Sequence, residues 1–331
     1  MNNQFFKFIE VCAGAGGLST GFCKQGFNPL LLNDFDKSCC NTLQNNHQDC
    51  NIVKDSFTNI NFLQYKNVDV LMGGVPCQSF SQAGKRKGLE DDRGNLLVEF
   101  INLIEKITPK VFLIENVKGL ITHENGETFQ KIKNKINKIN KYNLHYKVLN
   151  ANNYNVPQKR ERLFIIGTLK TLNNTFKFPE PNTYKPVLKD VLLEVPESEG
   201  YKYPQSKKEI MELVPPGGCW INLPLNIQKE YMKNSFNSGG GKRGIARRLS
   251  MDEPSLTLTT SPCQKQTERC HPNETRPLNI REYARIQTFP DNYIFSGSVA
   301  QQYKQIGNAV PVNLAIEMAK SIKSFLMENM H

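Results

Sequence analysis

Several residues with reactive side chains stand at the ends of apolar runs in this sequence. Cys77 follows Pro76 after one such run, and Glu115 follows the next. Arg160 and Arg162 stand just before another. Proline restricts the backbone, so it presents the thiol of Cys77 in a defined direction. A thiol, an acid and guanidinium groups in one place predict nucleophilic catalysis, whereas a buried structural cysteine is the alternative for Cys77 taken alone.

A glycine-rich turn lies between the first apolar run and a helical pattern. Gly14, Gly16 and Gly17 allow the backbone to approach a ligand closely, and Asp34 stands 20 residues after Gly14. Ser19 occupies the position of the third glycine of the dinucleotide fingerprint. The turn therefore indicates NAD, FAD or an adenosyl sulfonium as ligand, and a purely structural turn explains it equally well.

The first half of the chain alternates between strand-like apolar runs and helical patterns. This alternation predicts an α/β fold with a mostly parallel sheet that helices cover on both faces. Ligands of such sheets bind beyond the carboxyl ends of the strands, which is where the glycine turn, the cysteine and the acid stand. We expect strands at 5–12, 29–33, 68–72, 110–114 and 163–168, and helices at 18–25 and 96–107.

The remainder of the chain has a different composition. Residues 131–147 are rich in Asn and Lys, and isoleucines at helical spacing predict a solvated helix there rather than a DNA-binding arm. Beyond about residue 179 prolines and glycines replace the alternation, so we expect short strands and loops over 185–304. A loop from residue 305 and a terminal helix at 312–327 complete the expected chain.

The charge of the chain favours an anionic partner. Lys and Arg number 42 against 31 Asp and Glu in 331 residues, which leaves a net charge of +11 at pH 7. Such an excess suits nucleic acid, although a codon bias toward Lys and Asn is an alternative source for part of it. No apolar run approaches the ~18 residues of a membrane span, and no signal-peptide pattern is present, so we expect a cytoplasmic protein.

The cysteines do not indicate a disulfide framework or a metal site. Nine of them stand at irregular spacings without a CxxC pair. Cys263, Cys270 and His271 form a loose cluster that lacks the paired spacing of zinc ligands. We therefore expect most cysteines to be small buried side chains, and we expect no metal.

Short motifs occur in order at 13–17, 33–34, 55, 74–78, 93–96, 115–117, 158–162, 281–285, 289–291 and 305–311. They include Pro-Cys-Gln at 76–78 and Glu-Asn-Val at 115–117. In type, order and spacing these motifs resemble the cytosine carbon-5 DNA methyltransferases of bacterial restriction-modification systems, over most of the chain. The resemblance implies a Rossmann-like sheet that binds S-adenosyl-L-methionine, with a smaller target-recognition domain.

The resemblance implies roles for the reactive residues. Cys77 would attack carbon 6 of a cytosine flipped out of the duplex, and carbon 5 would then take the methyl group of S-adenosyl-L-methionine. Glu115 would hold the amino group and ring nitrogen of the base, while Arg160 and Arg162 would lower the pKa of the thiol. The implied catalytic residues are Cys77, Gln78, Glu115, Asn116, Arg160 and Arg162.

The resemblance also implies a cofactor pocket and a DNA-binding surface. Cys12 and Val75 depart from residues that are frequent in the family, which bears on affinity rather than on the reacting atoms. The implied cofactor-binding residues are Gly14, Gly16, Gly17, Asp34, Phe35, Asp55, Ser56, Pro76, Leu96, Asn308 and Val310. The implied DNA contacts are Ser81, Lys85, Arg86, Lys87, Arg93, Lys242, Arg243, Arg247, Arg248, Thr257, Lys265 and Gln266.

These implications define the expected organisation and partners. We expect a catalytic domain formed by 1–184 and 305–331, and a target-recognition domain with its hinge at 185–304. Double-stranded DNA is the expected partner of a nucleoid-associated monomer, and the family allows a cognate restriction endonuclease for the same site.

Two alternative functions stay open. One is a tRNA cytosine-5 methyltransferase, a branch with a shorter segment in place of 185–304. The other is a catalytically silent DNA-binding relative, against which the retention of Cys77 and Glu115 speaks.

Overall fold

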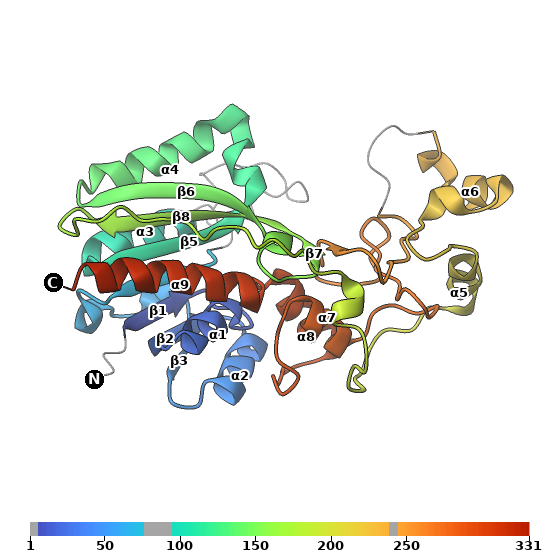
Figure 1. The fold of residues 1–331 in the computed structure, drawn as a ribbon, viewed down its shortest axis with the longest axis horizontal. Coiled ribbons are helices and arrows are strands. Elements are labelled where there is room, and N and C mark those ends of the chain that lie inside the picture. Colours follow the sequence, from blue (N-terminus) through green and yellow to red (C-terminus); the bar gives the residue numbers. More distant parts are fainter. Residues whose placement is uncertain (1–5, 76–94, 238–243, 331) are drawn as a thin grey trace.

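The computed structural model describes residues 6–75, 95–237 and 244–330 and has two lobes (Figure 1). The larger lobe contains the central sheet, and the smaller lobe carries α5 (Gln205–Glu212) and α6 (Leu225–Met232). Helices α7 (Ile280–Ile286) and α8 (Val299–Asn308) lie between them. Within the described ranges, no helix has both the length and the apolar composition that a membrane span requires.

The described sheet has seven strands in the order β3-β2-β1-β4-β5-β8-β6. Neighbouring strands from β3 to β5 pair in parallel, whereas β8 pairs antiparallel with both β5 and β6. Only β8 in this sheet therefore runs against the others, and the predicted mostly parallel α/β fold is confirmed. The strands are β1 (Lys7–Val11), β2 (Asn28–Asp34), β3 (Asn51–Lys54), β4 (Val70–Gly73), β5 (Val111–Val117), β6 (Tyr142–Asn150) and β8 (Glu161–Leu169).

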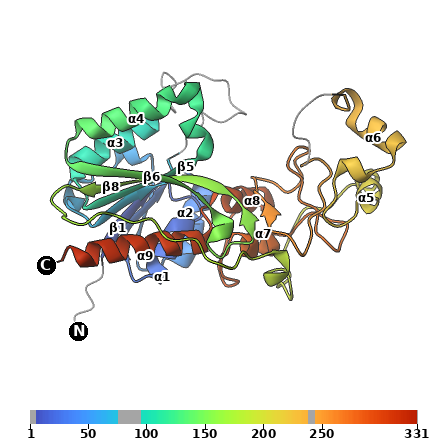
Figure 2. The ribbon, with the colours of Figure 1, turned by 45° about the horizontal axis from the view of Figure 1, so that its top comes forward.

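Helices cover both faces of the sheet, as Figures 1 and 2 show. On one face lie α1 (Gly17–Lys24), α2 (Lys37–Asn46) and α9 (Val312–Glu328), and on the other lie α3 (Asn95–Ile107) and α4 (Glu127–Lys138). Successive strand residues point to opposite faces, so Phe8 packs in one core with Phe22 of α1 and Ile9 packs in the other with Phe100 of α3. Burial on both faces explains why the central strands read as continuous apolar runs.

The expected strands and helices of the first half are all present, with ends shifted by a few residues. The helix predicted over 131–147 is wrong beyond Lys138, because α4 ends there and β6 begins at Tyr142. Asn140 adopts a φ of +54°, a left-handed conformation that commonly ends helices. Strand β6 lies at the sheet edge with many exposed polar side chains, which concealed its strand character in the sequence.

Residues 185–304 contain more helix than expected. Four helices, α5 to α8, lie wholly or partly in the described part of this segment, and β9 (Ser255–Leu256) is a two-residue strand paired with β7 (Gln158–Lys159) of the larger lobe. Helices α5 and α6 start directly after Pro204 and Pro224. Proline is favoured at the first turn of a helix, so the prolines that suggested turns also mark helix starts.

Helices α7 and α8 share a core with residues of both halves of the chain. This core includes Ala15 from the glycine turn, Leu188 and Leu258 from the 185–304 segment, and Val312 at the start of α9. The expected boundary between residues 304 and 305 falls inside the continuous helix α8. The smaller lobe has a separate core, which includes Trp220 and Met232.

The pairing of β5 with β8 requires a glycine, and this generates a prediction. A Cβ atom on Gly167 would lie 1.9 Å from Cε1 of Phe112, its fully buried register partner. We expect Gly167→Ala to lower the free energy of unfolding by about 1–3 kcal/mol, because the ring has no free space to move into. Urea unfolding measures this. Gly119→Ala, whose Cβ would meet no atom within 4 Å, is the control, and an equal loss in both variants would contradict the prediction.

Candidate active site

One edge of the sheet collects the residues expected to perform chemistry. The carboxyl ends of β1 to β5 lie at this edge because these strands are parallel. Strand β8 begins here because it runs the other way, and Arg162 near its start pairs with Val117 at the end of β5. The structure therefore brings together the glycine turn, Asp34 at the end of β2, Asp55 after β3, and Glu115 on β5.

Glu115 and Arg162 form a buried ion pair at this edge. Arg162 Nε lies 3.0 Å from Glu115 Oε1, and the two side chains are 15% and 10% exposed. In the strand register Glu115 stands opposite Phe164 and Arg162 opposite Val117, so the paired side chains are diagonal neighbours. Among the described residues no aligned hydrogen-bond donor reaches Oε1, so this oxygen keeps capacity to accept a hydrogen bond from a ligand.

Burial controls the charge of this pair. Burial raises the pKa of Glu115, while the positive charges of Arg162 and Arg160 act in the opposite direction. Burial also lowers the pKa of Arg162, and Glu115 opposes that change. Desolvation disfavours the charged form of each group. The Glu115 carboxyl therefore holds its proton to higher pH than an exposed glutamate does.

Asn116 fixes the segment that leads to the predicted nucleophile. Its Nδ2 donates a hydrogen bond of 3.2 Å to the carbonyl oxygen of Val75, which is 1% exposed. A Cβ on Gly74 would lie 3.5 Å from Glu115 Oε2, so this segment passes directly beside the carboxyl. Several predicted site residues lie outside the described residues: Pro76, Cys77, Gln78, Ser81, Lys85, Arg86, Lys87, Arg93, Lys242 and Arg243.

The glycine turn after β1 is built on Asp34. The Gly14 N–H donates to Asp34 Oδ2 at 2.8 Å, and the Asp36 N–H donates to Oδ1 at 2.9 Å. Gly14 and Gly16 have φ values of +55° and +76°, which other residues rarely adopt. A Cβ on Gly17 would lie 2.2 Å from the carbonyl oxygen of Val310. The turn therefore needs glycine for conformation at two positions and for close approach at the third.

The remaining predicted cofactor residues surround the same edge. Phe35 follows β2 with 75% of its surface exposed, an unusual state for an aromatic side chain next to a buried strand. Ser56 donates its N–H to Asp55 Oδ1 at 2.7 Å, which orients the exposed Asp55 carboxyl after β3. Leu96 is half-buried on α3, Asn308 is exposed at the end of α8, and Val310 is buried beside the glycine turn.

Arg160 occupies a different environment from Arg162. It is fully buried, and its guanidinium donates to the carbonyl oxygens of Leu258 at 3.0 Å, Gly307 at 2.9 Å and Asn308 at 3.3 Å. These contacts join the larger lobe to the segment after β9 and to the end of α8. Cys77 lies outside the described residues, so the role of Arg160 beside the thiol stays a prediction, whereas Arg162 lies directly against Glu115.

The predicted DNA contacts on the smaller-lobe segment fall into three groups. Arg248 is wrong as a DNA contact, because it is buried and donates to the Met211 carbonyl oxygen at 2.6 Å and to Thr275 Oγ1 at 2.8 Å. Arg247 lies 3.3 Å from Glu253, and Thr257 donates its hydroxyl to the Lys159 carbonyl at 2.8 Å. Lys265 and Gln266 are exposed.

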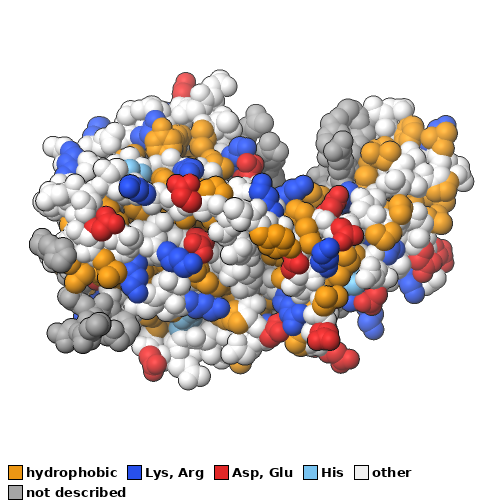
Figure 3. Space-filling model, in the orientation of Figure 1, with side chains coloured by type: hydrophobic (Ala, Val, Ile, Leu, Met, Phe, Trp, Pro, Cys, Tyr) orange, Lys and Arg blue, Asp and Glu red, His pale blue; other side chains and the backbone are white. Residues whose placement is uncertain are grey.

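The surface around the notch between the lobes carries both basic and acidic side chains. Figure 3 shows Lys and Arg side chains near the base of the notch that separates the two lobes. The notch opens between the larger lobe, which carries the Glu115 edge of the sheet, and the smaller lobe with α5 and α6. The Lys and Arg side chains at its base could pair with phosphate groups.

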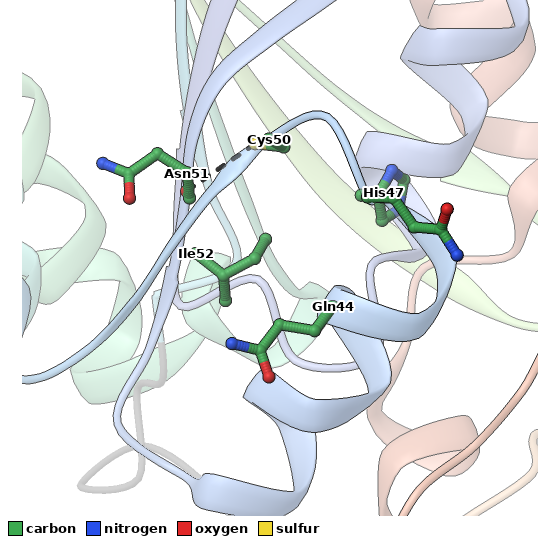
Figure 4. Close-up of a pocket in the computed structure, with 6 residues that line it drawn as sticks. Gln44, His47, Cys50, Asn51 and Ile52 are labelled. Carbon is green, nitrogen blue, oxygen red and sulfur yellow. Dashed lines mark hydrogen bonds between the residues drawn. The ribbon is translucent and has the colours of Figure 1, made fainter.

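Two cavities lie away from this edge. One of about 310 Å³ opens between the end of α2 and the start of β3, at the opposite edge of the sheet (Figure 4). It is lined by Gln44, His47, Gln48, Cys50, Asn51 and Ile52. The other, of about 580 Å³, lies among residues 197–208 and 275–279. Neither includes a predicted site residue, and among the described residues no group of three His, Cys, Asp or Glu side chains is placed to hold a metal ion.

Two residues with clear structural roles were not identified from the sequence. The Tyr293 hydroxyl donates to the carbonyl oxygen of Ala15 at 2.6 Å and so holds the glycine turn from outside. Gln287 is fully buried and bonds to Gln158 and to carbonyl oxygens at the end of α8. Both lie in or beside the motif at 281–291. Gln287 follows the mixed polar and apolar helix α7, so no local pattern distinguished it from an exposed polar residue.

Comparison with known proteins places this geometry in a family. A family model described as C-5 cytosine-specific DNA methylase matches residues 6–324. The chain is 51% identical over 336 residues to the Type II methyltransferase M.Eco47II of Escherichia coli, covering 98% of this chain and 81% of the relative. It is 48% identical over 332 residues to the Type II methyltransferase M.Sau96I of Staphylococcus aureus, covering 98% of this chain and 77% of the relative.

Solved structures agree with the fold. The Entamoeba histolytica methyltransferase EhMeth matches with a TM-score of 0.70 at 18% identity, over 98% of this chain and 99% of that chain. At this identity the likeness concerns the fold alone. The family match, by contrast, covers almost the whole sequence, and close relatives share half of its residues. The chain therefore belongs to the C-5 cytosine-specific DNA methylases.

Proposed function

We propose that this chain transfers a methyl group from S-adenosyl-L-methionine to carbon 5 of a cytosine in a specific sequence of duplex DNA, with Cys77 as the nucleophile. The observation that carries the proposal is the Glu115–Arg162 ion pair beside the segment that Asn116 holds at Val75. Cys77 is two residues after Val75. Because consecutive Cα atoms are about 3.8 Å apart, chain connectivity limits how far Cys77 can lie from Val75.

The residues at this edge fit the steps of the reaction. The thiolate of Cys77 would attack carbon 6 of the cytosine, forming a carbon–sulfur bond and giving carbon 5 the electron density to accept a methyl group. Glu115 would hold the amino group and ring nitrogen 3 and share its proton with that nitrogen as the adduct forms. A base would then remove the carbon-5 proton, and the thiolate would leave. Arg162 would keep Glu115 in place and supply positive charge near the thiolate.

The cofactor would occupy the edge formed by the first three strands. S-adenosyl-L-methionine, when bound, supplies an electrophilic methyl group. Gly14, Gly16 and Gly17 would admit its methionine part, because the turn leaves its backbone free of side chains at the ligand edge. Asp34 would meet the ribose and Phe35 the adenine, and the exposed ring of Phe35 supports this assignment. The other proposed pocket residues are Asp55, Ser56, Pro76, Leu96, Asn308 and Val310.

The two-lobed arrangement supports two domains with different functions. We assign residues 1–184 and 305–331 to the catalytic domain and 185–304 to target recognition, with α7 and the first part of α8 as the hinge. The proposed DNA contacts on the recognition side are Lys242, Arg243, Arg247, Thr257, Lys265 and Gln266, and those following the nucleophile are Ser81, Lys85, Arg86, Lys87 and Arg93. Cytosine would have to leave the duplex to reach Cys77. Arg160 takes a positioning role in this proposal.

The proposal extends to the biological setting. The Type II names of the relatives support a cognate restriction endonuclease that reads the same site. A DNA substrate would put the reaction in the cytoplasm, in association with the nucleoid. We also propose that the chain acts as a monomer. Methylation of a tRNA cytosine is the alternative substrate for the same chemistry, and a catalytically silent DNA-binding protein is the alternative without chemistry.

The first prediction of this proposal concerns the nucleophile. The purified chain with S-adenosyl-L-methionine should convert one cytosine in a fixed sequence context to 5-methylcytosine, detected by bisulfite sequencing of duplex DNA. Cys77→Ser should abolish transfer and retain DNA binding, because only the nucleophilic sulfur is lost. Cys263→Ser, at an exposed cysteine, is the control and should keep activity. Transfer to tRNA instead of DNA, or turnover by Cys77→Ser, would overturn the proposal.

The second prediction concerns the proton on Glu115. Glu115→Gln should lower the single-turnover rate roughly 100-fold or more, because an amide cannot share a proton with ring nitrogen 3. In the wild type the rate should fall as pH rises through the raised pKa of Glu115, since the protonated form is then lost. The variant should lack this decline. Glu161→Gln changes an exposed glutamate paired with Lys118 and should leave rate and pH profile unchanged.

The third prediction concerns the cofactor pocket. Gly17→Ala would place a Cβ 2.2 Å from the Val310 carbonyl oxygen and force the glycine turn away from the 308–310 segment. The Kd for S-adenosyl-L-methionine, measured by titration calorimetry, should rise at least about tenfold, which corresponds to about 1.4 kcal/mol. Gly119→Ala should leave this Kd unchanged. Unaltered affinity in Gly17→Ala would show that the cofactor does not use this turn.

A further inference from the structure

Three buried polar side chains join the recognition side of the molecule to the cofactor side. Gln158, Arg160 and Gln287 are each fully buried, and we call them the polar junction. They come from two parts of the chain: Gln158 and Arg160 lie in and directly after β7, and Gln287 follows α7. Buried polar groups are costly unless hydrogen bonds satisfy them, so the partners of these side chains show what the junction holds.

Gln158 and Arg160 hold the recognition side of the junction. Gln158 Oε1 accepts a hydrogen bond from the Leu258 N–H at 2.9 Å, and Arg160 Nη1 donates to the Leu258 carbonyl at 3.0 Å. Both backbone groups of Leu258 are therefore bonded to side chains of the larger lobe. Leu258 lies between Thr257 and Thr259, two residues after the strand β9. The segment 255–259 is thus fixed in register against the larger lobe.

Gln287 and Arg160 hold the cofactor side of the junction. Gln287 Nε2 donates to the carbonyl oxygens of Ile306 at 2.7 Å and Ala309 at 3.1 Å. Arg160 Nη2 donates to those of Gly307 and Asn308. The last carbonyls of a helix have no partner within it, and these side chains satisfy them at the end of α8. A guanidinium there also interacts favourably with the negative end of the helix dipole.

One hydrogen bond connects the two sides directly. Gln158 Nε2 donates to Gln287 Oε1 at 2.8 Å, so each amide uses both of its ends. The two sides also approach closely through the backbone, since a Cβ on Gly307 would lie 1.9 Å from the Thr259 carbonyl oxygen. Beyond Gly307 the chain reaches Val310, which lies against Gly17 of the glycine turn. A displacement of the segment at 306–310 would therefore move one wall of the proposed cofactor pocket.

We propose that Gln287 is a positioning residue for methyl transfer. Through the two ends of its amide it fixes the position of the cofactor-side segment 306–310 relative to the recognition segment 255–259. This inference rests on the proposed function, because it assigns those two segments to cofactor and DNA. The carbonyl end of Gln287 serves the recognition side through Gln158. The amide NH₂ end serves the cofactor side through Ile306 and Ala309. The two ends can therefore be tested separately.

Two substitutions separate the ends of the amide. The Gln287→Glu side chain can still accept a hydrogen bond from Gln158 but cannot donate one to the carbonyls of Ile306 and Ala309. KM for S-adenosyl-L-methionine should therefore rise about tenfold, with little change in KM for DNA. Gln158→Leu leaves the Leu258 N–H without its acceptor, so KM for DNA should rise about tenfold with little change in KM for the cofactor. Gln287→Leu should raise both KM values, because it removes both ends of the amide.

The controls distinguish positioning from general destabilisation. Gln130→Leu changes an exposed glutamine on α4 and should leave both KM values unchanged. If Gln158→Leu does not fold, Tyr283→Phe removes the single hydrogen bond from the Tyr283 hydroxyl to the Thr259 carbonyl and should raise KM for DNA in the same direction. Thermal unfolding of each variant is measured in parallel.

The outcomes separate this inference from the proposed function. A wild-type chain without methyl transfer to DNA would refute the proposed function. A wild-type chain that methylates DNA would refute the positioning role of Gln287 if Gln287→Glu and Gln158→Leu lost only thermal stability or kcat, or if each of these two variants raised both KM values equally. A selective rise in KM for S-adenosyl-L-methionine with Gln287→Glu, and a selective rise in KM for DNA with Gln158→Leu, support it.

Discussion

A carboxyl group buried at the end of a strand needs a positive charge beside it, and the architecture of this protein supplies one by reversing a single strand. If β8 ran parallel to β5, its first residues would lie at the opposite edge of the sheet. Because it is antiparallel, Arg162 reaches Glu115 as a diagonal neighbour 3.0 Å away. The antiparallel direction of β8 thus brings Arg162 and Glu115 into one site. Burial raises the pKa of Glu115, and Arg162 remains its ion-pair partner.

The same reversal determines how the two lobes are joined. The chain enters β8 through β7 and Arg160, so the segment that precedes the site also carries the residues that bond to the recognition side. Parallel pairing of β7 with β9 and the bonds of Gln158 and Arg160 to Leu258 attach residues 255–259 to the larger lobe. The buried hydrogen bonds there favour a single arrangement of the lobes, since any displacement would leave buried groups without partners.

The positive charge of the chain is distributed among different kinds of sites. Arg160, Arg248 and Arg269 are buried and donate to backbone carbonyls, so they hold loops in place and are not free to meet phosphate. On α4, Lys133 lies over the rings of Phe129 and Tyr146. Exposed residues such as Lys265 remain for a polyanion. The excess of +11 therefore overstates the charge available at a DNA surface, because part of it is structural.

The sequence by itself determined the α/β class, the order of the central strands along the chain, and the residues at their ends, because apolar runs and glycine turns are local signals. It also carried the family motifs, and with them the chemistry. Only the tertiary structure decided that β6 is an edge strand rather than a helix, that Arg248 is buried, and that Arg160 and Arg162, two residues apart, have different partners. Gln287 became recognisable only in contact with Gln158. These outcomes depend on which strands are neighbours and in which direction they run, and residues distant in the sequence decide that.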